Sequence, residues 1–163
     1  MESGPRSRHE DSPPPRFLAD AMLGRLARWL RILGYDAEYF LGEDDHLLRQ
    51  ARGEGRILLT RDTRLLQRQS LPPHLFIESD HVMEQLRQVV AALGLDPAAP
   101  PAHRCSCCNA VLEPRDRDQV EGLVPEFVLS HHEAFQACPR CQRIYWAGTH
   151  RRRMEEAIRA LGT

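Results

Sequence analysis

The chain has 163 residues, of which 42% are hydrophobic and 28% charged, and its formal net charge is −1. The length excludes a large multidomain protein, and the composition excludes a fibrous or wholly disordered one. The near-neutral charge argues against a protein that binds polyanions over its whole surface, although every one of its 22 basic residues is an arginine.

The first segment, residues 1–15, holds four prolines among serine, glycine and charged residues. It lacks the apolar centre of a signal peptide, and no apolar run in the chain is long enough to cross a bilayer. We therefore expect a disordered tail on a cytoplasmic protein that has no membrane partner. A second proline-rich stretch, residues 96–102, predicts a linker between an N-terminal unit at 16–95 and a cysteine-bearing unit at 103–163.

Short β-like runs alternate with amphipathic helical stretches in the N-terminal unit, which favours an α/β sandwich around a mostly parallel sheet. Leucines three and four residues apart predict the first helix, and glycines mark where this helix and the next one end. In chain order we expect a strand at 17–19, a helix at 22–33, a strand at 36–40, a helix at 45–52, strands at 57–60 and 75–79, and a helix at 81–93.

An aspartate stands at or just beyond the end of each predicted strand: Asp20, Asp44, Asp62 and Asp80. Because the carboxyl ends of parallel strands share one edge of a sheet, these acids should converge there. Clustered carboxylates repel one another unless a divalent cation compensates them, and their oxygens suit Mg²⁺ or Mn²⁺. Such a site can generate a hydroxide for attack on a phosphodiester, which is nuclease chemistry.

Each of these aspartates taken alone could instead cap a helix, and Asp80 is the weakest member of the set. The second position could also be Asp45. Among the nearby arginines, Arg25 and Arg61 are our candidates for binding phosphate. Arg28 and Arg31 are better explained as an ordinary solvated helix face, and Trp29 as a core residue.

The five cysteines form two tight pairs with one residue to spare, which points to a metal rather than to disulfides. Cys105 and Cys108 make one C-x-x-C knuckle and Cys138 and Cys141 the other, so four thiolates can close a structural zinc site. Cys107 is the spare. The stretch between the pairs is longer than the usual 15 to 20 residues or so, and predicts a loop inserted within 113–136.

The C-terminal segment, 138–163, holds six arginines against two glutamates. Basic residues interleaved with aromatic ones are typical of surfaces that bind single-stranded nucleic acid. A solvated terminal helix is the simpler alternative. The candidate contacts are Trp146, Arg151, Arg152 and Arg153.

Four motifs occur in order: FLADAMLGRLARWLRILGYDAEYF, DDHLLRQARGEGRILLTRDTRLL, RCSCCNAVLEP and CPRCQRIYWAGTHRRRM. Together they resemble the Mut-seven C-terminal RNase domain family, and the resemblance extends over nearly the whole chain from Arg16. It implies a PIN-like nuclease fold followed by a zinc ribbon. It also implies that Asp20, Asp44 and Asp62 correspond to the acidic metal ligands of PIN-type ribonucleases, with Asp80 a fourth. Where the family often has another acidic residue, this chain has His46, and Thr149 stands where serine is usual.

The sequence thus favours a ribonuclease that depends on Mg²⁺ or Mn²⁺, acts on single-stranded RNA and contains a structural zinc. The alternative is an RNA-binding adaptor, associated with the ribosome or an RNA-processing complex, that keeps the fold without turnover. Cleavage of DNA is a third hypothesis, because no residue pattern in the sequence reads a 2′-hydroxyl.

Overall fold

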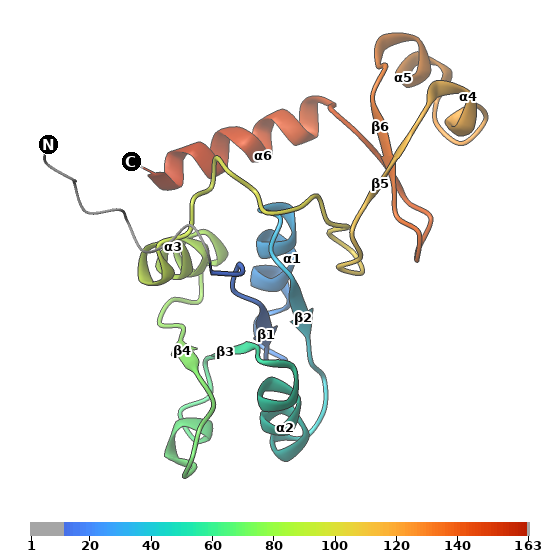
Figure 1. Cartoon of the computed structure of the whole chain (residues 1–163). Coiled ribbons are helices and arrows are strands. Elements are labelled where there is room, and N and C mark those ends of the chain that lie inside the picture. Colours follow the sequence, from blue (N-terminus) through green and yellow to red (C-terminus); the bar gives the residue numbers. More distant parts are fainter. Residues whose placement is uncertain (1–11, 163) are drawn as a thin grey trace, which may run out of the picture.

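The computed structural model describes residues 12–162, and Figure 1 shows their arrangement. A four-stranded sheet with the order β2-β1-β3-β4 lies at the centre of the N-terminal part, and each neighbouring pair of strands is parallel. This confirms the predicted α/β class. The elements are β1 (Phe17–Ala19), α1 (Gly24–Ile32), β2 (Ala37–Tyr39), α2 (Asp44–Glu54), β3 (Ile57–Thr60), a 3-10 turn (Leu65–Gln67), β4 (His74–Phe76) and α3 (Val82–Leu93).

Both faces of this sheet are buried, so its central strands are apolar at consecutive positions rather than at alternate ones. Phe17 and Leu59 pack with Leu30 of α1 and Leu86 of α3 on one face. Leu18, from the same strand as Phe17, packs on the other face with the buried leucines of α2 and with Leu58. The result is three layers, with α1 and α3 on one side and α2 on the other.

A second sheet follows the cysteine pair at 105–108 and is antiparallel, with the order β5-β6-β7. Two short helices lie between its first two strands, where the cysteine spacing predicted an inserted segment. The elements here are β5 (Glu113–Arg115), α4 (Arg117–Val120), α5 (Glu126–His131), β6 (Phe135–Ala137), β7 (Ile144–Trp146), α6 (Thr149–Arg159) and a final 3-10 turn (Ala160–Gly162).

The last helix leads away from this ribbon and back to the first unit, as Figure 1 shows. Ile158 and Leu161 are buried in the same apolar core as Leu30 and Leu86. The end of the chain therefore packs against the α1 and α3 layer, although the predicted unit boundaries placed it with the cysteines. Those boundaries, at 95 and 103, stay predictions. None of the helices in residues 12–162 combines the length and the apolar character that crossing a bilayer requires.

Candidate functional site

The carboxyl edge, where the C-terminal ends of the parallel strands meet, carries a small cavity of about 100 Å³. From β1 the chain continues to β2 on one side of the sheet, and from β3 it continues to β4 on the other side. The direction of the strand order therefore reverses between β1 and β3. Ligands of open α/β sheets bind at such a reversal. Asp20, Asp44 and Asp62 all line this hollow, which we call the acidic cavity.

Asp20 directly follows β1 and is the most enclosed of the three, with 6% of its surface exposed. Its Oδ2 accepts hydrogen bonds from the Thr60 hydroxyl at 2.5 Å and from the Arg61 backbone N–H at 3.2 Å. Its Oδ1 accepts one from the Met22 N–H at 3.0 Å. These donors hold the carboxylate in one orientation beside the cavity.

Thr60, the last residue of β3, connects two of the acids and was not singled out by the sequence analysis. Its hydroxyl donates to Asp20 and accepts the backbone N–H of Asp62 at 3.0 Å. Asp62 Oδ1 in turn accepts the N–H of Arg64 at 2.9 Å. The sequence does show a hydroxyl residue at the end of a predicted strand, two positions before an aspartate. That pattern indicates a role for Thr60 only when β1 and β3 are known to be neighbouring strands.

At the second position the structure favours Asp44 over Asp45. Asp44 is the first residue of α2, lies half-buried and lines the acidic cavity. Asp45 is exposed and forms an ion pair with Arg68 at 2.9 Å. The backbone N–H groups at the start of α2 also favour a negative charge at this position.

Asp80 does not line the acidic cavity. The strand predicted at 75–79 ends at Phe76, so the chain has already left the edge of the sheet when it reaches Asp80. The side chain is 81% exposed, and its Oδ1 lies 3.6 Å from Nε2 of His81. We therefore leave Asp80 out of the site.

The two arginines predicted to bind phosphate have different surroundings. Arg61 Nη1 donates to the carbonyls of Glu78 at 2.9 Å, of Ile77 and of Ser79, so this nitrogen holds the segment after β4 in place. Arg25 is exposed in the first turn of α1, close in sequence to Met22 on the cavity wall.

The two C-x-x-C pairs meet in a single cluster, in which the sulfur atoms of Cys105, Cys108, Cys138 and Cys141 all lie within 4.8 Å of one another. Each pair forms the same turn: the N–H of the residue after the second cysteine bonds to the carbonyl of the first, at 2.9 Å in both cases. That residue, Asn109 or Gln142, has a positive φ of 72° or 64°. Cys107 is exposed and stands outside the cluster.

The cluster suits a metal ion such as zinc. Cys105 and Cys138 are buried. Burial alone would raise the pKa of the Cys105 thiol, but hydrogen bonds from the Tyr145 hydroxyl and from backbone N–H groups lower it to about 6. Hydrogen bonds also lower the pKa of Cys138, whereas burial and hydrogen bonds with the other cysteines raise the pKa values of Cys108 and Cys141, so without a metal the four thiols share the charge unequally. A deprotonated sulfur is the form that binds metal. Within residues 12–162 this is the one group of three or more histidine, cysteine or acidic side chains that lie close enough together to hold an ion. The carboxylates of the acidic cavity therefore lie farther from one another than the four sulfur atoms do.

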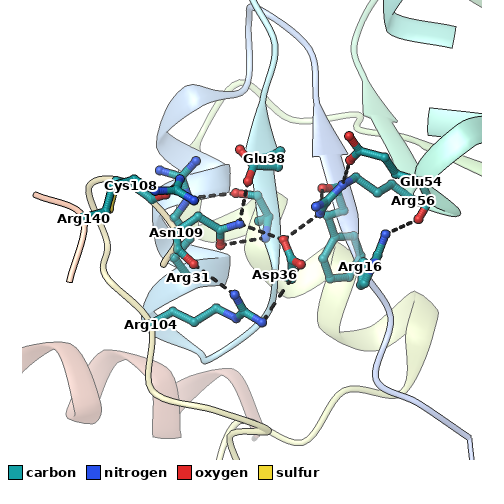
Figure 2. Close-up of polar contacts among 12 residues, drawn as sticks. Arg16, Arg31, Asp36, Glu38, Glu54, Arg56, Arg104, Cys108, Asn109 and Arg140 are labelled. Carbon is teal, nitrogen blue, oxygen red and sulfur yellow. Dashed lines mark hydrogen bonds and ion pairs between the residues drawn. The ribbon is translucent and has the colours of Figure 1, made fainter. Parts of the chain in front are cut away.

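The first cysteine knuckle docks onto β2, the edge strand of the parallel sheet, as Figure 2 shows. Asn109 is only 4% exposed. Its side-chain oxygen accepts the Ala37 N–H at 3.1 Å, and its nitrogen donates to Asp36 at 2.7 Å and to Glu38 at 3.0 Å. The bond from Ala37 gives a partner to a backbone N–H group on the open side of this edge strand.

Arg31 makes the second connection, and the expectation of a solvated position for it is wrong. The side chain is buried on α1, with Nε donating to the Ala37 carbonyl at 2.7 Å and Nη1 to the Cys107 carbonyl at 3.0 Å. Leucine periodicity could not reveal this, because the elements that cover Arg31 come from a distant part of the chain. Arg31, Asp36 and Asn109 form what we call the junction.

The junction lies at the amino edge of the sheet, opposite the acidic cavity. Asp36 precedes β2 and Arg56 precedes β3, and Arg56 Nη1 contacts Asp36 at 2.6 Å and the Phe17 carbonyl at 3.2 Å. Burial raises the pKa of Asp36, but hydrogen bonds from Arg56 and Asn109 outweigh that effect and hold it below its ordinary value. The cysteine cluster and the carboxylates therefore stand at opposite ends of the strands.

Of the predicted nucleic-acid contacts, Trp146 lies half-buried at the end of β7 and lines a groove of about 780 Å³ beside α1. Arg152 and Arg153 are exposed on α6. The side chain of Arg151 lies outside the described residues.

A family model described as the Mut7-C RNAse domain matches residues 15–158 of the chain. No curated protein and no solved structure matches it. The matched span includes the three aspartates of the acidic cavity and all four cysteines of the cluster.

Proposed function

Since the chain belongs to the Mut7-C RNAse domain family and so has an RNase-like nuclease domain, we propose that it hydrolyses RNA phosphodiester bonds with a divalent metal held at the acidic cavity. The observation that carries this proposal is the shared lining of one cavity by Asp20, Asp44 and Asp62, at the reversal point of the sheet. Three carboxylates from separate segments of the chain match the oxygen donors that Mg²⁺ or Mn²⁺ prefers.

These residues would divide the work as follows. Asp20, fixed by Thr60 and two backbone N–H groups, supplies a carboxylate of set orientation. Asp62, two residues after β3, and Asp44, the first residue of α2, supply oxygens from two other segments of the cavity lining. Mg²⁺ or Mn²⁺, when bound, lowers the pKa of a water molecule and offsets the charge that develops on the phosphate.

The second part of the proposal concerns the cysteine cluster, which we assign to a structural Zn²⁺. Four thiolates complete a tetrahedral site and leave no position for water or substrate. Its role would be to hold the knuckle that carries Asn109 against β2. None of the five cysteines forms a disulfide, which suits a reducing compartment, and the cytoplasm is the location that we propose.

Single-stranded RNA is the proposed substrate, because the ribbon and α6 offer exposed arginines together with Trp146, an aromatic side chain on which an unpaired base can stack. Recruitment through the ribosome or an RNA-processing complex is compatible with such a surface. Matched RNA and DNA oligonucleotides, incubated with Mg²⁺ or Mn²⁺, would separate ribonuclease from deoxyribonuclease activity.

The decisive experiment replaces one carboxylate at a time in the full chain. Asp62→Asn and Asp44→Asn should lower the rate of metal-dependent RNA cleavage by roughly 100-fold or more, with an unchanged melting temperature. Asp45→Asn is the matched control, because its side chain is exposed and paired with Arg68. Equal cleavage by the Asp62 and Asp45 variants would overturn the assignment.

A non-catalytic RNA-binding adaptor is the competing function, and one observation favours it. The hydrogen bonds that Asp20 and Asp62 accept come from residues at and just beyond the ends of β1 and β3, as they would if these acids only stabilised the loops there. In that case the Asn variants would bind and release RNA as the wild type does, and neither Mg²⁺ nor Mn²⁺ would produce cleavage.

A further inference from the structure

We propose that the groove beside Trp146 is a second binding site for single-stranded RNA, connected to the acidic cavity by helix α1. The inference rests on the proposed ribonuclease function and extends it from a cutting site to a substrate path. We call this hollow the ribbon groove. Its walls come from the end of α1, from the first cysteine knuckle and from the segment around β7, and the residues that matter most are Arg28, Arg104, Arg143, Tyr145 and Trp146.

The lining is chemically suited to nucleic acid. It contains three arginines and a histidine, and among the described residues that line it there is no carboxylate, in a chain whose overall charge is −1. Trp146 and Tyr145 offer aromatic faces on which a base can stack, and two glutamines offer donors and acceptors for base edges. A volume of about 780 Å³ lies within the range of roughly 300 to 1,000 Å³ of sites that enclose small organic molecules, so a nucleoside fits.

Arg104 adds an independent observation. Its Nη1 donates to the Asn109 carbonyl at 2.9 Å, and its Nη2 lies 4.0 Å from Asp36. Its Nε is, in the described part of the chain, the one buried side-chain nitrogen or oxygen without a hydrogen-bond partner. Buried donors are rarely left without an acceptor. The atom is covered by protein, so an oxygen in the groove would reach it once the guanidinium turns toward the groove, whose wall Arg104 forms.

The position of α1 connects the two sites. The helix starts at the carboxyl edge, two residues after Met22 on the wall of the acidic cavity, and ends at Ile32 on the wall of the ribbon groove. Arg25, Arg28 and Ile32 share one helix face, because they are three and four residues apart. Arg25 and Arg28 are both exposed. They form a basic track from one site to the other.

The length of this track sets the length of RNA that can use both sites. From Gly24 to Ile32, α1 rises about 12 Å, in eight steps of about 1.5 Å each. Stacked nucleotides are about 3.4 Å apart, so some four nucleotides fill the distance. RNA of four nucleotides or fewer bound at the acidic cavity should not reach the ribbon groove.

The test measures binding of fluorescein-labelled, unstructured RNA of 12 and 4 nucleotides to the full-length protein, by anisotropy in buffer without Mg²⁺ or Mn²⁺. The double variant Arg28→Gln/Arg143→Gln should bind the 12-mer about tenfold more weakly. The slope of log affinity against log salt should fall by about 0.7 for each phosphate that the variant no longer neutralises. Trp146→Ala should weaken binding by a similar factor. Arg87→Gln, an exposed arginine on α3 outside the groove, is the matched control.

Unchanged binding of the 12-mer by the double variant would overturn the groove assignment. Equal losses for the 12-mer and the 4-mer would keep the groove as a binding site and overturn its connection to the acidic cavity along α1. Cleavage of the same RNAs with Mg²⁺ or Mn²⁺ distinguishes this failure from failure of the ribonuclease proposal. If the wild type binds through the groove but does not cleave, the groove stands and the catalytic assignment falls. If it cleaves both RNAs and the groove variants cleave and bind like the wild type, only the groove assignment falls.

Discussion

The two ends of the parallel sheet hold two different kinds of site. At the amino edge, four sulfur atoms lie within 4.8 Å of one another and are fixed by two equivalent backbone turns. At the carboxyl edge, three aspartates share a cavity without gathering so closely. Four thiolates saturate their metal and build structure, whereas carboxylates around an open cavity leave room for water and a phosphate. The difference separates the part of the molecule that holds the fold together from the part that would act on RNA.

The largest expected effect follows from breaking the cysteine cluster. Cys108→Ser removes one of four ligands from a type of site whose metal contributes about 10 to 16 kcal/mol in small zinc domains. We expect the bound zinc, measured by atomic absorption, to fall from about one ion per chain to near zero. Protease cleavage should then appear in the ribbon at 104–146. Cys107→Ser, at the exposed spare thiol, should keep its zinc, and loss of zinc there would reassign the ligand.

A smaller loss should follow from removing the arginine of the junction. Arg31→Met leaves the carbonyls of Ala37 and Cys107 without their charged donor, and we expect the free energy of unfolding to fall by about 2 to 3 kcal/mol in urea titrations. Arg28→Met, three residues earlier and exposed, should change it by less than about 0.5 kcal/mol. If Arg31→Met lowered the free energy of unfolding no more than Arg28→Met does, the contacts of Arg31 at the junction would add nothing to stability.

At the acidic cavity, Thr60→Val should cost about 1 to 2 kcal/mol, because it removes the hydroxyl that donates to Asp20 and accepts from Asp62. It should also reduce metal-dependent cleavage, since the Asp20 carboxylate loses its strongest donor. Thr60→Ser keeps the hydroxyl and should retain both properties. A purely steric role for Thr60 would instead spare the valine variant, which has nearly the same shape, and impair the serine variant, which lacks the methyl group. Thr63→Val, at an exposed position, is the control.

The smallest expected effect concerns the stability of the fold at acidic pH. The pKa of Asp36 is lower in the folded protein than its ordinary value of about 3.9, so its contribution to stability is fully present above that value. It is lost as the pH falls through the folded pKa. Asp36→Asn should therefore flatten the decline of unfolding free energy below about pH 4, as measured by urea titrations at several pH values. An unchanged slope would show that Arg56 and Asn109 do not stabilise the carboxylate.

The sequence allowed local features to be predicted well. The strand at 57–60 and the helix at 81–93 follow from apolar runs and leucine spacing, and the structure has β3 at Ile57–Thr60 and α3 at Val82–Leu93. Each C-x-x-C pair likewise carries its own turn. Such elements depend on neighbouring residues, so periodicity and spacing are sufficient to find them.

Features that depend on contacts between distant segments could not be predicted in the same way. Arg31 lies three residues after Arg28, so its spacing from the leucines predicts the same exposed helix face. It is buried because the first cysteine knuckle covers it. Asp80 follows a strand-like run, yet β4 ends too early to bring it to the cavity. Thr60 gains its role only because β3 lies beside β1. The ribbon groove has walls from three separate stretches of chain, none of which is distinctive alone.

Because α6 packs against the core of the N-terminal unit, the ribbon is an insertion between two segments of that unit rather than a separate C-terminal domain. Before the ribbon, the chain passes close to the end of α1 at Gly34. A Cβ at this position would collide with the carbonyl oxygen of Ala102, so only glycine allows the two segments to lie this close together. On the downstream side of the ribbon, Ile158 and Leu161 are anchored with Leu86. Cutting the chain short before α6 would strip apolar cover from the nuclease layer, so removal of the ribbon calls for excision and rejoining rather than truncation.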